Sequence, residues 1–188
     1  MRTCLVNAAM FFLLGVPSVA DAQQFEGENL LVSVPEGWVA VTGARKGTMY
    51  LSEFVPKGQT ADNWRQMITI QVFHGMGHVD PKTFVDGMTA GAREQVENDA
   101  FAVTPLDMPG DPGYPSFGVL WASGRVRSTG QGEITAIRAI QGKDSLYVVQ
   151  KAWRQAAFSS AEQLTVSPEE IRKGVDFLSE AKVVDTRK

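Results

Sequence analysis

The segment His74-Gly75-Met76-Gly77-His78 contains both histidines of the chain, with a methionine midway between them. Imidazole and thioether groups are ligands that suit copper. In an extended strand, side chains two residues apart point to the same face, so His74, Met76 and His78 would point together. These three residues are the candidate metal site, and copper is the candidate cofactor.

A second interpretation of this segment needs no metal. Apolar and polar residues alternate from Ile68 to Val72, and His74 continues that alternation. Gly75 and Gly77, however, are typical of a turn at the end of a strand. His74 would then lie at the edge of the core. Spacing alone does not determine the backbone, so both interpretations stay open.

Candidate catalytic residues are few. The chain has no Gly-x-Ser-x-Gly motif, so a serine triad would have to use His74 or His78. Asp107 and Asp111 could serve hydrolysis as a carboxylate pair. They lie in a segment rich in proline and glycine, where aspartates commonly form turns. We expect no enzymatic activity, and a hydrolase with an unrecognised carboxylate site is kept as an alternative.

Two further groups of residues could take part in binding. Arg125 and Arg127, two positions apart on an expected strand, could form a small basic face toward an acidic partner, or a solvated strand edge. Six aromatic residues could line a pocket between sheet and helix, or fill the core as aromatic residues usually do: Trp38, Trp64, Phe117, Trp121, Tyr147 and Trp153.

Residues 1–22 have the pattern of a secretory signal peptide. Met1 and Arg2 precede an apolar stretch over 5–16, and Ala20-Asp21-Ala22 fits the small-x-small cleavage pattern. The apolar stretch is shorter than the roughly 20 residues that span a bilayer, and no later stretch is as apolar. We expect cleavage, an exported domain over 23–188 without a transmembrane segment, and a periplasmic or extracellular location.

Composition narrows the possible partners. The chain has one cysteine, Cys4, which lies in the expected signal peptide. The mature domain would therefore lack disulfides, zinc–thiolate sites and cysteine nucleophiles. The formal net charge of -3 comes from well-mixed acidic and basic residues. Nucleic acid and anionic membrane surfaces are therefore not expected as partners.

Strand patterns dominate the first part of the expected domain. Alternation over 30–34 and 38–41, around Pro35-Glu36-Gly37, predicts a β-hairpin. Two more strands are expected over 48–55 and 67–72. Beyond them, Asp80 as N-cap, Pro81 in the first helical position and an apolar residue every fourth position predict a helix.

A loop is expected over 104–116, because Pro109-Gly110-Asp111-Pro112-Gly113 disfavours both helix and strand. Ser167-Pro168-Glu169-Glu170 has the pattern of a capping box and predicts a final helix with an apolar stripe. Between the loop and this helix, glycine-containing turns join three strand-like segments into an expected antiparallel meander: 117–127, 133–141 and 146–153.

This order of elements predicts a single α+β domain, with a twisted antiparallel β-sheet flanked by helices. It resembles the Mog1/PsbP/DcrB-like superfamily, through Val32-Ser33-Val34-Pro35-Glu36-Gly37-Trp38 and through the terminal helix over 168–182. The resemblance implies that fold for most of the mature chain. Members range from photosystem-associated subunits to transport-related and secretion-chaperone proteins, so it implies a scaffold more than an activity.

The function expected from these observations is binding. We expect an exported, non-enzymatic binding or interaction protein that uses the sheet surface or the 104–116 loop, with an envelope protein or a small ligand as its partner. A periplasmic copper-binding protein that uses His74, Met76 and His78 is the alternative from a different functional class.

Overall fold

The computed structural model describes residues 27–187, so the expected signal peptide over 1–22 and Cys4 lie outside the described residues. Two short 3-10 helices, η1 (Glu97–Asp99) and η2 (Ala161–Gln163), accompany the main elements. In chain order these are β1 (Glu28–Leu31), β2 (Trp38–Lys46), β3 (Met49–Pro56), β4 (Gln66–His74), α1 (Pro81–Glu94), β5 (Phe101–Leu106), β6 (Ser116–Ser123), β7 (Gly132–Gln141), β8 (Ser145–Gln155), α2 (Pro168–Glu180) and β9 (Lys182–Asp185).

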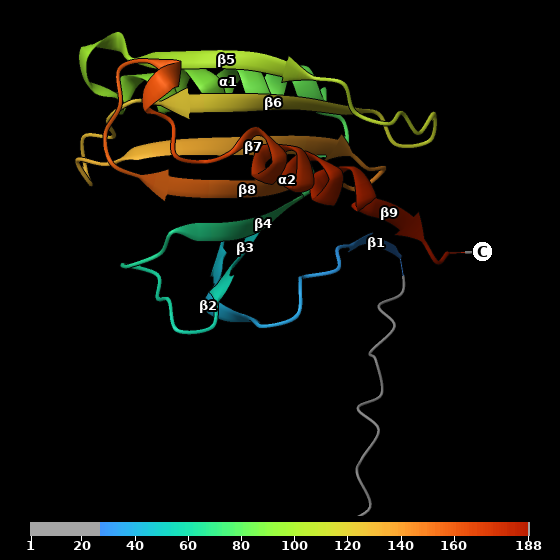
Figure 1. The fold of residues 1–188 in the computed structure, drawn as a ribbon. Coiled ribbons are helices and arrows are strands. Elements are labelled where there is room, and N and C mark those ends of the chain that lie inside the picture. Colours follow the sequence, from blue (N-terminus) through green and yellow to red (C-terminus); the bar gives the residue numbers. More distant parts are fainter. Residues whose placement is uncertain (1–26, 188) are drawn as a thin grey trace, which may run out of the picture.

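Seven strands form one antiparallel sheet in the order β2-β3-β4-β8-β7-β6-β5. Helix α1 covers one face of this sheet and α2 covers the other (Figure 1). Strands β1 and β9 form a separate two-stranded antiparallel sheet near the end of α2. The architecture is the α+β fold that the sequence predicts. No helix within 27–187 is long and apolar enough to cross a membrane.

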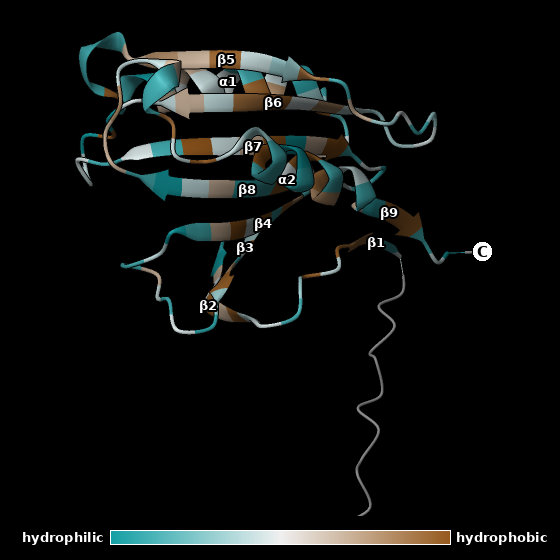
Figure 2. Cartoon of the chain, in the orientation of Figure 1, coloured by the Kyte–Doolittle hydropathy of each residue, from teal (hydrophilic) through white to brown (hydrophobic). Residues whose placement is uncertain are grey.

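Two apolar cores lie on opposite faces of β7 and β8. Successive side chains of a strand point to opposite faces. Ile134, Ala136 and Ile140 of β7 therefore pack with Leu178 of α2. Ile137 of β7 packs on the other face, in the cluster that includes α1. Because both faces are buried, apolar residues occur at successive positions of these strands, and Figure 2 shows them interrupted by hydrophilic residues.

Both predicted helix starts are confirmed. Asp80 Oδ1 accepts the N–H of Thr83 at 2.8 Å, so Asp80 is the N-cap of α1. In α2, Glu170 N–H donates to Ser167 Oγ at 3.2 Å, and Ser167 N–H donates to Glu170 Oε2 at 3.0 Å. This is the reciprocal capping box that the sequence predicts. Local side-chain chemistry is sufficient for both, because each cap involves residues three positions apart.

The predicted hairpin over 30–34 and 38–41 is wrong. The first of its strands is β1, which pairs with β9 so that Leu30 faces Val183, 153 positions later in the chain. The second is part of β2, whose partner is β3. Alternation identifies a strand but carries no information about its partner. The turn after Pro35 closes only one backbone hydrogen bond, from Trp38 N–H to Pro35 O at 3.3 Å.

The predicted loop over 104–116 is also too long. Its first residues belong to β5 (Phe101–Leu106), which pairs with β6 at the edge of the sheet. Pro105 lies within this strand, and an edge strand tolerates proline because one of its sides needs no hydrogen bonds. The irregular segment is therefore 107–115.

Two cations are buried beneath α2. Arg138 of β7 and Lys151 of β8 are 4% and 7% exposed, and neither forms an ion pair with a carboxylate of the described residues. Arg138 donates to carbonyl groups at the end of α2. Lys151 Nζ donates only to Gln66 Oε1, at 2.8 Å. The two cations are therefore stabilised to very different extents.

Lys151 predicts a specific dependence of stability on pH. Burial lowers the pKa of Lys151 from 10.5 to about 7. Between these values the unfolded chain binds a proton that the folded chain does not, so the free energy of unfolding rises with pH. Lys151→Met should stabilise the protein by roughly a few kcal/mol below about pH 7, and this advantage should shrink toward about pH 10.

Urea unfolding of both proteins across this pH interval measures the difference. Lys173→Met, at an exposed position of α2, is the matched control and should show no comparable trend. An advantage of Lys151→Met that stays constant with pH would contradict the prediction.

Gly174 sets how closely α2 approaches the sheet. A Cβ at this position would overlap the Trp153 ring, whereas a Cβ at Gly87 of α1 would meet no atom within 4 Å. Gly174→Ala should lower the free energy of unfolding by about 1–3 kcal/mol because of overpacking. Gly87→Ala should raise it by up to about 1 kcal/mol, since alanine favours helix. Urea unfolding midpoints test both, and equal effects at the two glycines would argue against this packing constraint.

Candidate functional site

A cavity of about 450 Å³ lies between the 107–115 loop, the end of α2 and β9. One wall comes from the loop residues Pro109 to Tyr114, and another comes from four consecutive residues, Ala181 to Val184. Strand β7 contributes Arg138 and Ile140. A cavity of this size suits a small ligand or a few residues of an extended peptide. The irregular segment that the sequence singles out therefore does form part of a concave surface.

The loop keeps its shape through local hydrogen bonds. Asp111 Oδ1 accepts the N–H of Gly113 at 2.8 Å, and Asp111 O accepts the N–H of Tyr114 at 2.9 Å. Pro115 O accepts the N–H of Gln141 at 2.8 Å, which attaches the loop to β7. Asp111 thus has the turn-forming role that the sequence offers as an alternative to catalysis. Asp107 is exposed at the start of the loop.

Arg138 joins the three parts of the cavity. Its Nη1 donates to Leu178 O at 2.9 Å and to Ala181 O at 3.1 Å, at the junction of α2 and β9. Its Nη2 donates to Pro109 O at 3.2 Å, within the loop. Burial lowers the pKa of Arg138, and the nearby charge of Asp111 opposes this shift. The Arg138 guanidinium therefore holds the loop, the end of α2 and β7 together. Its N–H donors are used by these protein acceptors, so its role is to position the cavity walls.

Free polar groups are present in the cavity wall. The Tyr114 hydroxyl has no hydrogen-bond partner among residues 27–187, and burial raises the pKa of this group. Lys182 lies in the wall, is exposed and forms no ion pair within the described part of the chain. Val183 and Val184 add apolar surface. The cavity therefore combines apolar contact with two hydrogen-bond donors.

Strand β9 has one paired edge. It pairs with β1 from Lys182 to Asp185, and no other strand in 27–187 pairs with it. The cavity follows the chain from Ala181 to Val184. A strand edge of this kind offers backbone N–H and C=O groups to an added extended segment.

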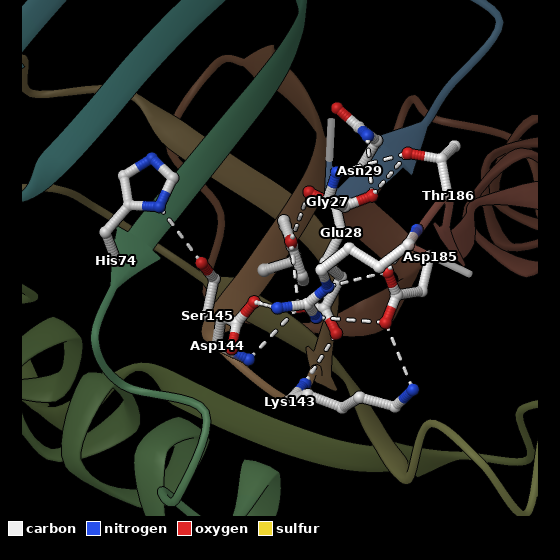
Figure 3. A network of polar contacts seen from close by, with 11 residues as sticks. Gly27, Glu28, Asn29, His74, Lys143, Asp144, Ser145, Asp185 and Thr186 are labelled. Carbon is white, nitrogen blue, oxygen red and sulfur yellow. Dashed lines mark hydrogen bonds and ion pairs between the residues drawn. The ribbon is translucent and has the colours of Figure 1, made fainter. Parts of the chain in front are cut away.

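A polar network holds the β1–β9 sheet against the turn between β7 and β8 (Figure 3). Glu28 Oε2 accepts the N–H of Lys143 at 2.6 Å, and the Tyr147 hydroxyl donates to Glu28 Oε1 at 3.0 Å. Asp185 pairs with Lys143 at 3.1 Å and with Arg187 at 2.9 Å. Hydrogen bonds from Arg187 lower the pKa of Asp185 well below its usual range. The network keeps β9 in position as a cavity wall.

The histidine segment does not continue as a strand. Strand β4 ends at His74, and Gly75 has a φ of 79°, in the left-handed region that favours glycine. His74 is exposed, with Nδ1 3.0 Å from Ser145 Oγ (Figure 3) and its ring 5.2 Å from that of Tyr50. The strand spacing assumed for a joint metal site therefore stops at His74.

No group of three or more His, Cys, Asp or Glu side chains suited to a metal occurs in the described part of the chain. Copper binding by His74, Met76 and His78 stays a prediction. A copper titration of the mature protein, followed by tryptophan fluorescence, tests it.

The two candidate binding arginines lie outside the strand predicted to carry them. Strand β6 ends at Ser123, and Arg125 and Arg127 follow it. Arg125 pairs with Glu97 at 3.1 Å, and Arg127 Nε donates to Glu94 O at 3.3 Å. Both side chains are therefore bound to the end of α1 and to η1. The strand prediction extended too far because this segment forms an irregular turn after β6.

Most of the aromatic residues belong to the core. Trp64, Trp121, Tyr147 and Trp153 are buried, and Phe117 packs against the core on the α1 face. Trp38 and the buried Trp153 also line a second cavity of about 300 Å³ between the sheet and α2, together with Lys151. The core interpretation therefore holds for most of the set, and two residues line a pocket between sheet and helix.

Sequence reasoning missed Arg138 and Lys151, the two cations of the α2 face. The available signal was a charge at a buried position: Arg138 falls between Ala136 and Ile140 on one face of β7. Lys151 falls in the same way between Val149 and Trp153 of β8. A charged residue in phase with a buried face rarely occurs without a specific reason.

Comparison with known proteins identifies the fold. No family model matches the chain, and no curated protein matches it in sequence. A point mutant of protein Mog1 superposes with a TM-score of 0.53 at 15% identity, over 84% of this chain and 92% of that one. Saccharomyces cerevisiae Ran-binding protein Mog1p gives 0.52 at 14% identity, over 86% and 98%. LpqN of Mycobacterium tuberculosis, involved in cell envelope biogenesis, gives 0.45 at 11%, over 86% and 87%. The two Mog1 superpositions show that the chain has the α+β fold of Mog1, the fold that the resemblance to the Mog1/PsbP/DcrB-like superfamily implies.

Proposed function

We propose that this chain is an exported, non-enzymatic interaction protein that binds an extended segment of a partner protein in the cavity beside β9. The observation that carries the proposal is the unpaired edge of β9 next to a cavity that follows residues 181–184. Backbone hydrogen bonds from such an edge supply affinity, and side-chain pockets supply selectivity.

The surroundings of this edge favour a peptide over a free small molecule. The Tyr114 hydroxyl and the Lys182 ammonium group can donate to carbonyl or carboxylate oxygens of a bound segment. Val183 and Val184 can contact its apolar side chains. Because the polar network and Arg138 already hold the walls, a partner would enter a preformed site, and this chain itself would lose little conformational entropy on binding.

Two further observations support this role. Mog1p, which shares the fold, is a Ran-binding protein, so the scaffold is compatible with binding another protein. Export rests on the signal-peptide pattern over 1–22, which predicts an envelope protein as the partner. The proposal needs no cofactor and no catalytic residue.

Single-cysteine variants test where the partner binds, because the expected mature chain has no cysteine of its own. Each variant is labelled with a thiol-reactive photocrosslinker. Pro112→Cys and Lys182→Cys carry the label on two walls of the cavity, and Ala90→Cys carries it on an exposed position of α1 as a control. Envelope extract should yield crosslinks from positions 112 and 182 to one partner, within a segment of about ten residues. Equal crosslinking from position 90, or unrelated products from the two walls, would contradict the proposal.

A synthetic peptide of the crosslinked segment then measures the contribution of the cavity. Gly110→Phe adds bulk at the cavity wall and should weaken peptide binding by about tenfold or more. Gly43→Phe, on β2, is the control and should leave binding unchanged, since a Cβ at either glycine meets no atom within 4 Å. Isothermal titration calorimetry gives both affinities. Equal affinity of the Gly110→Phe variant and the wild type would place the segment outside the cavity.

A further inference from the structure

The second cavity, of about 300 Å³, lies between the sheet and residues 170–177 of α2. Trp38, Trp153 and Phe177 contribute aromatic side chains to its lining, and Pro35 and Ile68 add apolar surface. Lys151 is 7% exposed within this lining. The cavity is therefore an aromatic pocket that contains a buried amine.

Lys151 has capacity for another partner. Its ammonium group carries three N–H donors, and one of them meets Gln66 Oε1 at 2.8 Å. Its Nζ lies 3.9 Å from the centre of the Trp38 ring, a cation–π contact, and 5.5 Å from that of Trp153. No carboxylate in the described part of the chain pairs with it.

Glu170, the acidic residue of the lining, attracts Lys151 electrostatically but forms no ion pair with it. Glu170 Oε2 accepts from Ser167 N–H at 3.0 Å and from Ser167 Oγ at 2.9 Å, as part of the α2 capping box. Lys173, also in the lining, pairs with Glu169 at 2.9 Å. Glu169 therefore neutralises Lys173, and protonated Lys151 is the cation of the lining that no carboxylate of the described residues pairs with. A ligand with a single negative charge would balance it.

We propose that this pocket binds a small aromatic monocarboxylate, whose carboxylate pairs with Lys151 Nζ while its ring packs against Trp38, Trp153 and Phe177. The flat aromatic walls favour a ring, because offset and edge-to-face ring contacts add to the stabilisation from burial. One ammonium group suits a carboxylate better than a phosphate, which is commonly bound by several donors or by arginine. The site is separate from the loop cavity and does not depend on the proposed partner binding there.

The unliganded state strengthens this assignment. Burial lowers the pKa of Lys151 to about 7, and the charge of Glu170 opposes this shift only in part. A bound carboxylate favours the ammonium form, so Lys151 takes up a proton from the solvent when the ligand binds near neutral pH. Binding should weaken as pH rises and the amine becomes neutral.

Isothermal titration calorimetry with 2-naphthoate tests the proposal on the mature protein. The neutral analogue 2-naphthalenemethanol reports the contribution of the ring alone, and octanoate reports that of a flexible carboxylate. The wild type should bind 2-naphthoate in a 1:1 complex, at least about tenfold more tightly than either analogue. Equal affinity for the neutral analogue would overturn the ion pair, and tighter binding of octanoate would overturn the aromatic assignment.

Variants at the amine separate its charge from its packing. Lys151→Met should weaken 2-naphthoate binding by about tenfold or more and leave 2-naphthalenemethanol within about threefold. Lys151→Arg should restore most of the affinity for the carboxylate. Lys173→Met is the matched control for loss of one lysine charge and should change affinity by less than about threefold. No loss in Lys151→Met, or an equal loss in both lysine variants, would overturn the proposal.

The pH profile provides a second readout. Affinity of the wild type for 2-naphthoate should fall by about tenfold or more between about pH 6 and pH 9, and that of Lys151→Arg should stay nearly constant. Glu170 and Lys173 are the other titratable residues of the lining. Glu170→Gln, which keeps a capping-box side chain, and Lys173→Met should both retain the wild-type trend. A flat wild-type profile would contradict the role of Lys151.

Discussion

The buried guanidinium of Arg138 is the interaction on which the functional end of the molecule depends. It lies on the α2 face of β7 and donates to carbonyl groups at the end of α2, at the junction of α2 and β9, and in the 107–115 loop. Carbonyl groups at a helix C-terminus carry partial negative charge and lack intrahelical partners, so they suit a cation. One side chain therefore connects the sheet, the second helix and the loop.

Arg138 and Lys151 lie on the same face of the sheet, but their charges are stabilised to different extents. Hydrogen bonds to a charged group contribute about 1.5–3 kcal/mol each, and Arg138 has several. Lys151 has one hydrogen bond and a cation–π contact, against a desolvation penalty of several kcal/mol for a buried ion. Arg138 thus behaves as a positioning residue. Lys151 retains free donors, which is the property expected of a ligand-binding group.

Much of the fold could be predicted because its signals are local. Alternation identified β4, and strand-like segments bounded by proline and glycine turns identified β3 and the β6–β8 meander. The caps at Asp80 and Ser167 identified both helix starts. The pairing of β1 with β9 could not be predicted, since it joins residues 153 positions apart and only tertiary packing selects it. The part of the candidate site that was predicted, the loop after β5, was recognised by its prolines and glycines.

The sequence alone determined the α+β class, the positions of both helices and the irregular segment around 109–113, because hydrophobic periodicity, capping pairs and proline content act over a few residues. Tertiary structure decided which segments line the cavity beside β9 and which line the cavity between the sheet and α2. It placed β9 beside the loop, bound Arg125 and Arg127 to the end of α1 and to η1, and enclosed Lys151 between Trp38 and Trp153. These contacts join distant residues, and their free energies depend on burial, which no local pattern records.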